Sequence, residues 1–199
     1  MKHVCAVVLL LLAGAIPAAA APIVFTTTLS GPAEEPPNAS PGTGSARVTF
    51  DDVAHTMRVE VDFAGLLGPV SVAHIHVING PGDTNTSDTL GPVTTPTPTF
   101  PGFPSGVTSG DYDGTFDMTL ASSYRPGFIT SAGSVSMAEQ ALFDGLLDGR
   151  AYLNVHSTLF PGGEIRGFLT PADVPEPASL TLLGLALVGA GVRRLRTRR

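Results

Sequence analysis

The stretch of sequence that decides the fold, residues 46–63, reads ARVTFDDVAHTMRVEVDF. Apolar side chains occupy every second position in two runs, 46–50 and 57–63, and polar side chains fill most positions between them. Because side chains alternate between the two faces of a β-strand, this pattern predicts two strands, each with one buried and one polar face. The short connection at 51–54 predicts that the two strands form a hairpin.

The chain from about residue 22 to residue 172 continues in short alternating runs separated by Gly, Pro, Ser and Thr. We expect five further strands, at 24–29, 70–77, 114–120, 151–156 and 164–169. This pattern is typical of an all-β sandwich or barrel.

Two segments depart from the strand pattern. Residues 136–147 place Met137, Ala141 and Leu142 at helical spacing, which predicts one short helix at the sandwich edge, with Ser136 as its cap and Gly149 in the turn after it. Residues 79–110 are rich in proline and threonine, and we expect a long loop there, outside the core.

The first 20 residues have the character of a secretory signal peptide. A lysine near the start is followed by an apolar run at 4–16 and by small residues, with a cleavage site expected after Ala20 or Ala21. The apolar run is short for a retained membrane anchor, which is the alternative. The only cysteine, Cys5, falls within this segment, so the processed chain should contain neither a disulfide nor a thiolate metal site.

Residues 173–199 form a second processing segment in three parts. An apolar run of 15 residues at 178–192 predicts a transmembrane helix, and the arginines after it should stay in the cytoplasm. The three parts are the motif Pro175, Glu176 and Pro177, the apolar run, and the membrane-flanking residues Arg193, Arg194, Arg196, Arg198 and Arg199.

This order resembles the PEP-CTERM sorting signal of Gram-negative bacteria. The resemblance implies that signal peptidase processes one end of the chain and an exosortase-type enzyme the other, after a transient stay in the inner membrane. The product would reach the outer surface or the extracellular matrix, often alongside exopolysaccharide. A permanent single-span anchor is the alternative reading of the same segment.

Charge excludes one class of partner. All 17 acidic residues lie within 21–177, where the basic side chains are five arginines and no lysine. A nucleic-acid interface needs clustered Lys and Arg, so nucleic acid is not an expected partner. The acidic surface of this segment would also repel anionic polymers unless a divalent cation bridged the two.

The central domain, residues 21–172, resembles the CHRD domain, first named from chordin. Three blocks carry the resemblance: LSGPAEEPP at 29–37 with GTG at 42–44, AHIH at 73–76, and AYLNVH at 151–156 continuing through FPGGEIRG at 160–167. The resemblance implies a secreted β-domain and no particular biochemical activity.

Three histidines are candidate metal ligands. His74 and His76 share one face of their strand, opposite an apolar row of Ala73, Ile75 and Val77, so both should point away from the core. His156 lies on the outward row of the strand at 151–156. If the two strands are neighbours, three neutral imidazoles converge, a ligand set that suits copper or zinc. The alternative is that these histidines are solvated or hydrogen-bonded to a loop.

The same histidines carry a weaker resemblance to copper/zinc superoxide dismutases, which are Greek-key β-sandwiches. That resemblance implies a Greek-key order of strands, with His74, His76 and His156 as the equivalents of copper ligands. No histidine lies between His76 and His156, the disulfide cysteines are missing, and Glu164 stands where those enzymes place an arginine. Dismutation is therefore disfavoured.

Two functions remain open from the sequence. The favoured one is a non-catalytic, exported β-sandwich module that binds or builds the extracellular polysaccharide matrix. The alternative is a redox protein that binds copper or zinc through the three histidines. No catalytic residues are assigned.

Overall fold

The computed structural model describes residues 21–84 and 88–172. The predicted signal peptide, the sorting motif and the apolar run at 178–192 lie outside these residues. Within them, no helix is long and apolar enough to cross a membrane. The elements are β1 (Ile23–Ser30), β2 (Thr43–Asp51), β3 (Thr56–Ala64), β4 (Val70–Val77), β5 (Gly110–Asp117), α1 (Pro126–Ala132), α2 (Val135–Leu147), β6 (Ala151–Ser157), β7 (Ile165–Phe168) and β8 (Thr170–Pro171), with two short 3-10 turns at Gly31–Ala33 and Ala121–Ser123.

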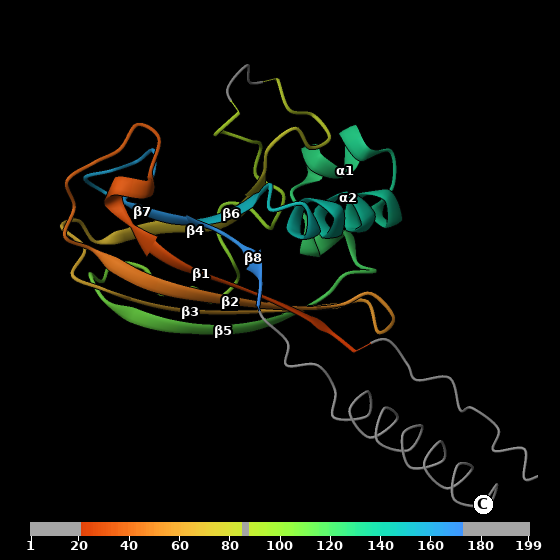
Figure 1. Ribbon diagram of the computed structural model, residues 1–199, viewed down its shortest axis with the longest axis horizontal. Helices are drawn as coiled ribbons and strands as arrows, with labels where there is room; N and C mark the ends of the chain where they lie inside the picture. The colour runs from red at the N-terminus through yellow and green to blue at the C-terminus, as the bar shows by residue number, and fades with distance from the viewer. Residues whose placement is uncertain (1–20, 85–87, 173–199) are drawn as a thin grey trace, which may run out of the picture.

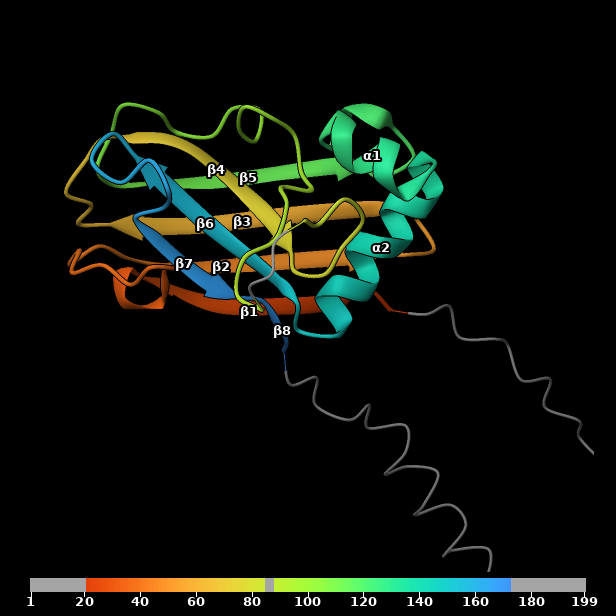
Figure 2. The same ribbon diagram turned by 90° about the horizontal axis from the view of Figure 1, so that it is seen from above.

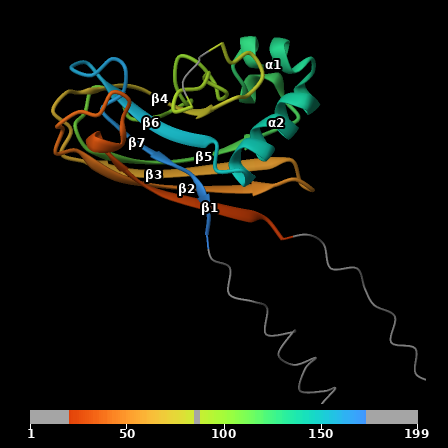
Figure 3. The same cartoon turned by 45° about the horizontal axis from the view of Figure 1, so that its top comes forward.

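The strands form one sheet that folds over on itself, in the order β4-β6-β7-β1-β2-β3-β5, and β8 pairs with β1. Strands β1, β2, β3 and β5 make one layer and β4, β6 and β7 the other, as Figures 1 and 3 show. After β3 the chain crosses to β4 in the opposite layer and returns to β5 beside β3, as in a Greek key. The predicted all-β sandwich is confirmed.

The predicted hairpin is β2 and β3. Its register sets Val48 opposite Val59 and Phe50 opposite Met57, and all four side chains are buried. The turn is closed by the side chain of Asp51, whose Oδ1 accepts hydrogen bonds from two backbone N–H groups at 53 and 54. Each fully buried apolar side chain of this kind contributes roughly 1.5–3 kcal/mol to folding.

The strand predicted at 114–120 is displaced towards the N-terminus, since β5 covers Gly110–Asp117. The side chain of Asp117 accepts hydrogen bonds from both the backbone N–H and the hydroxyl of Thr119. That local turn ends the strand, and a period-2 pattern cannot reveal where such a turn begins.

The predicted helix exists as α2, but its cap is Ser134, whose Oγ accepts the N–H of Met137 at 3.1 Å, and Ser136 is the second residue of the helix. Helix α1 was not predicted. It has only seven residues and ends at Gly133, which has a φ of 102°, so it is too short to show a helical period. Both helices close one end of the sandwich (Figure 2).

The expectation that residues 79–110 lie outside the core is wrong at two positions. Phe100 and Phe103 are buried among the aromatic side chains of the core, with Phe100 5.7 Å from Tyr112 and Phe103 5.7 Å from Phe63 between ring centroids. The buried apolar residues of the described structure fall between 25 and 169, so this stretch contains a complete core of its own.

Candidate metal centre

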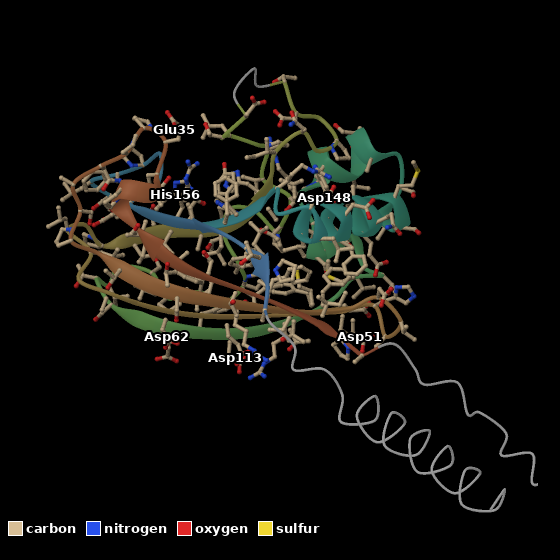
Figure 4. The ribbon with its side chains drawn as sticks, viewed as in Figure 1. Glu35, Asp51, Asp62, Asp113, Asp148 and His156 are labelled. Atoms are coloured by element: carbon tan, nitrogen blue, oxygen red, sulfur yellow. The ribbon has the colours of Figure 1, made fainter. Side chains whose placement is uncertain are left out.

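Strands β4 and β6 are antiparallel neighbours, and their register places His74 opposite Asn154 and Val72 opposite His156. The alternate row of β4, Ala73, Ile75 and Val77, is fully buried in the core, which turns the histidines to the opposite face. Figure 4 shows His156 on this face, above the layer of β4, β6 and β7. The predictions that the strands are neighbours and that the histidines point away from the core are confirmed.

The three imidazoles converge. The ring centroids of His74 and His156 lie 5.5 Å apart, those of His74 and His76 5.8 Å, and those of His76 and His156 6.5 Å. One nitrogen from each ring lies within 4.8 Å of the other two. Around a tetrahedral ion with bonds of about 2.0–2.1 Å, ligand nitrogens lie about 3.3 Å apart, so small ring movements would complete the geometry.

Each ring is anchored by a backbone carbonyl through one nitrogen. His74 Nε2 contacts the Pro98 oxygen at 2.5 Å, His76 Nδ1 the Gly91 oxygen at 2.8 Å, and His156 Nδ1 the Pro161 oxygen at 2.9 Å. A carbonyl only accepts, so these nitrogens carry the protons of the neutral rings. The lone pairs therefore lie on His74 Nδ1, His76 Nε2 and His156 Nε2, and a metal-binding histidine is typically held in this way.

Two of those lone pairs have no partner. His74 and His76 are 6% and 9% exposed, and within the described residues His74 Nδ1 and His76 Nε2 are buried without a hydrogen bond. An unsatisfied buried polar atom costs about 1–3 kcal/mol, so a ligand at this point would be stabilising. Burial lowers the pKa of both histidines to about 4, and both are neutral at neutral pH.

The histidine face is covered by the long loop, which lies along the free edge of β4. Thr95 Oγ1 accepts the N–H of Ile75 and Thr99 Oγ1 accepts the N–H of Ala73, both at 2.9 Å. Threonine hydroxyls thus accept from N–H groups on an edge of β4 that has no neighbouring strand. The threonine-rich run at 94–99 was the available sequence signal for this cover. His74 and His76 are buried and His156 is half-buried, and the expected alternative of hydrogen bonds to a loop is observed in all three rings.

A stack of rings flanks the histidines on β6 and β7. The ring of Tyr152 lies parallel to that of His76, 4.7 Å away at an interplanar angle of 7°. The guanidinium of Arg166 lies 5.0 Å from the Tyr152 ring and 5.6 Å from the Phe168 ring. These contacts hold His76 in one orientation, and they were not predicted from the sequence because they depend on strand register.

Glu164 and Arg166, which follow one another at an interval of two residues, have different partners. Arg166 Nε lies 3.8 Å from Glu34 Oε2 and donates to the Ala33 oxygen. Glu164 is fully buried and accepts hydrogen bonds from Ser40 Oγ and from backbone N–H groups at 67 and 68. The carboxylates of Glu34 and Glu164 are therefore engaged outside the histidine cluster. In the described part of the chain no carboxylate joins that cluster.

Comparison with protein families accounts for the three sequence blocks quoted above. The CHRD domain profile matches residues 25–169. This chain belongs to the CHRD family. The PEP-CTERM protein-sorting motif matches residues 173–198, behind the CHRD domain. Both resemblances drawn from the sequence are confirmed, and the chain is an extracellular or surface β-module that an exosortase-type system sorts.

Comparison with curated protein sequences gives no match. Among solved structures, the CHRD domain is similar to a mutant of superoxide dismutase 5 from Candida albicans, with 13% sequence identity and a TM-score of 0.44, over 80% of this chain and 98% of that one. The resemblance is weak.

Proposed function

We propose that this CHRD domain is a non-catalytic module that binds one copper or zinc ion through His74, His76 and His156. The observation that carries the proposal is the placement of the protons. Each ring donates one N–H to a backbone carbonyl, which leaves the other nitrogen with a lone pair, and one nitrogen of each ring lies within 4.8 Å of one nitrogen of the other two. Hydrogen bonds of solvated surface histidines would have no reason to leave three lone pairs together.

The donor set selects the class of metal. Three neutral imidazoles suit Cu²⁺, Zn²⁺ or Ni²⁺, whereas Ca²⁺ and Mg²⁺ prefer oxygen ligands. A divalent ion would also offset part of the negative charge of the domain, which otherwise repels anionic polysaccharide. We propose the extracellular polysaccharide matrix as the place where the module acts, a proposal supported by the sorting motif.

A redox role is the second candidate, because three protein ligands alone would leave a position on copper for a small substrate. The redox role requires this open coordination position, and the non-catalytic role does not. The non-catalytic role is favoured because the loop at 79–110 covers the site and holds two of its rings.

The experiment is a metal titration of residues 21–172, produced without a histidine tag. Wild type should bind one Cu²⁺ or Zn²⁺ per chain with sub-micromolar affinity, measured by competition with a chromophoric chelator. His156→Ala should weaken binding at least about a hundredfold, since even the outer partner of a metal-bound histidine is worth about 10–100-fold.

The matched control is His55→Ala. His55 lies at the β2–β3 turn, is half-exposed, and contacts Glu139 Oε1 at 2.8 Å, away from the cluster. Its loss should leave metal affinity unchanged. Wild type that binds neither ion at micromolar concentration, or two variants that lose affinity equally, would refute the proposal.

A further inference from the structure

Asn154 lies among the three histidines, and no role in metal binding was expected of it. It stands directly opposite His74 in the register of β4 and β6, and its side chain is on the same face as the imidazoles. It is only 3% exposed. Its Oδ1 lies 3.1 Å from His156 Nε2.

This contact brings two hydrogen-bond acceptors together. His156 Nδ1 donates to the Pro161 oxygen, so in the neutral ring Nε2 carries a lone pair. That lone pair faces the amide oxygen of Asn154, which also carries lone pairs and no proton. An amide rotated by 180° would donate from Nδ2 to this lone pair, whereas the observed orientation places two donors of electron pairs where a cation can lie between them. Two ligands of one tetrahedral ion lie about 3.3 Å apart, close to the observed separation.

The second histidine of β4 lies on the same face, because His74 and His76 are two residues apart on one strand. His76 Nε2 is one of the two buried ring nitrogens without a hydrogen-bond partner in the described structure. The Asn154 amide oxygen therefore contacts one of the three nitrogen atoms that the metal would use, on the face that carries all three.

Among the residues that the structure describes, no acidic side chain joins the three histidines. The buried acids of this part of the molecule, Glu34 and Glu164, are held by Arg166 and by Ser40 respectively. The fourth donor that the fold itself supplies is the Asn154 amide oxygen.

We propose that Asn154 Oδ1 is the fourth protein ligand and completes a closed sphere of three nitrogens and one oxygen. The inference rests on the metal binding proposed above and goes beyond it. An amide oxygen is a harder donor than imidazole, so the set favours Zn²⁺ or Cu²⁺ over Cu⁺. A closed sphere has no position for water or a small substrate, as in structural rather than catalytic metal sites.

The test uses azide, a small anion that binds Cu²⁺ wherever a coordination position is open. Residues 21–172 are loaded with one equivalent of Cu²⁺ and titrated with azide, and the visible and electron paramagnetic resonance spectra are recorded. The wild-type spectra should not change, and no azide-to-copper charge-transfer band should appear. Asn154→Ala should bind Cu²⁺ about tenfold more weakly and should develop that band.

Asn154→Asp is the matched control, because it keeps an oxygen donor of the same size in the same place. It should stay insensitive to azide. Wild-type copper that takes azide would overturn the closed sphere and leave the three-histidine site intact, whereas wild type without bound copper would overturn both. The wild-type titration decides the matter even if the alanine variant does not fold.

Discussion

At the scale of single residues, the two ring nitrogens of each of the three clustered histidines have different roles. One nitrogen of each ring fixes the ring to a backbone carbonyl, and the other is left with its lone pair. The sequence predicted the three residues, because a period of two residues puts His74 and His76 on one face. It could not predict which nitrogen is free, or that Asn154 joins them, because both depend on register and on a distant loop.

Glu34 gives a prediction about pH at the same scale. Burial raises its pKa from 4.5 to about 7, against the opposing charge of Arg166. The folded protein therefore holds this proton more tightly than the unfolded chain, and the stability that neutral Glu34 contributes is lost as pH rises from about 4.5 to about 7.

Glu34→Gln is neutral at every pH and should escape this loss. The free energy of unfolding of the variant minus that of wild type should rise across this window by up to about 1.4 kcal/mol per pH unit and then level off. Urea denaturation of both proteins at pH 5, 6, 7 and 8 measures the difference, in which the contributions of the histidines cancel. A difference that does not vary with pH would contradict the account of Glu34.

At the scale of elements, the long loop acts as a substitute edge strand. The hairpin β2–β3 was predictable because its own alternation specifies it. The pairing of the loop with β4 was not predictable, because it uses threonine hydroxyls and an isolated bridge between Val93 and His76. Helix α1 escaped prediction for the related reason that its seven residues show no period of their own.

Thr95→Val tests the loop. Valine keeps the shape of the side chain and removes the acceptor for the buried N–H of Ile75, which should cost about 1–3 kcal/mol in the free energy of unfolding. Thr97→Val is the control, since Thr97 is exposed, and should change stability by less than about 0.5 kcal/mol. Amide hydrogen exchange at Ile75 should accelerate in the first variant alone; equal exchange in both would argue against the role of the hydroxyl.

At the scale of the whole molecule, a CHRD domain with a complete core stands in front of a sorting motif. Composition and alternation were enough to predict the all-β class, whereas the family was predicted from the resemblance of three sequence blocks and the export from the two end segments. The burial of the histidine face could not be predicted from the sequence, because it arises only when the loop at 79–110 folds back over β4.

Removal of residues 175–199 tests the sorting. The truncated chain keeps the predicted signal peptide at residues 1–20 and its core, so it should be exported and then lost from the cell surface into the medium. Immunoblots of surface and medium fractions report the distribution. Surface display equal to that of the full chain would show that the segment is not needed for retention.

The most direct measurement for the central claim is a Zn²⁺ titration of residues 21–172 followed by two-dimensional ¹H–¹⁵N NMR of the imidazole rings. We expect saturation at one equivalent, with the metal-induced ¹⁵N shifts at His74 Nδ1, His76 Nε2 and His156 Nε2, and no shift at His55. Shifts confined to His55, or no saturable shift in the three rings, would contradict the claim that this face of the CHRD domain binds a metal ion.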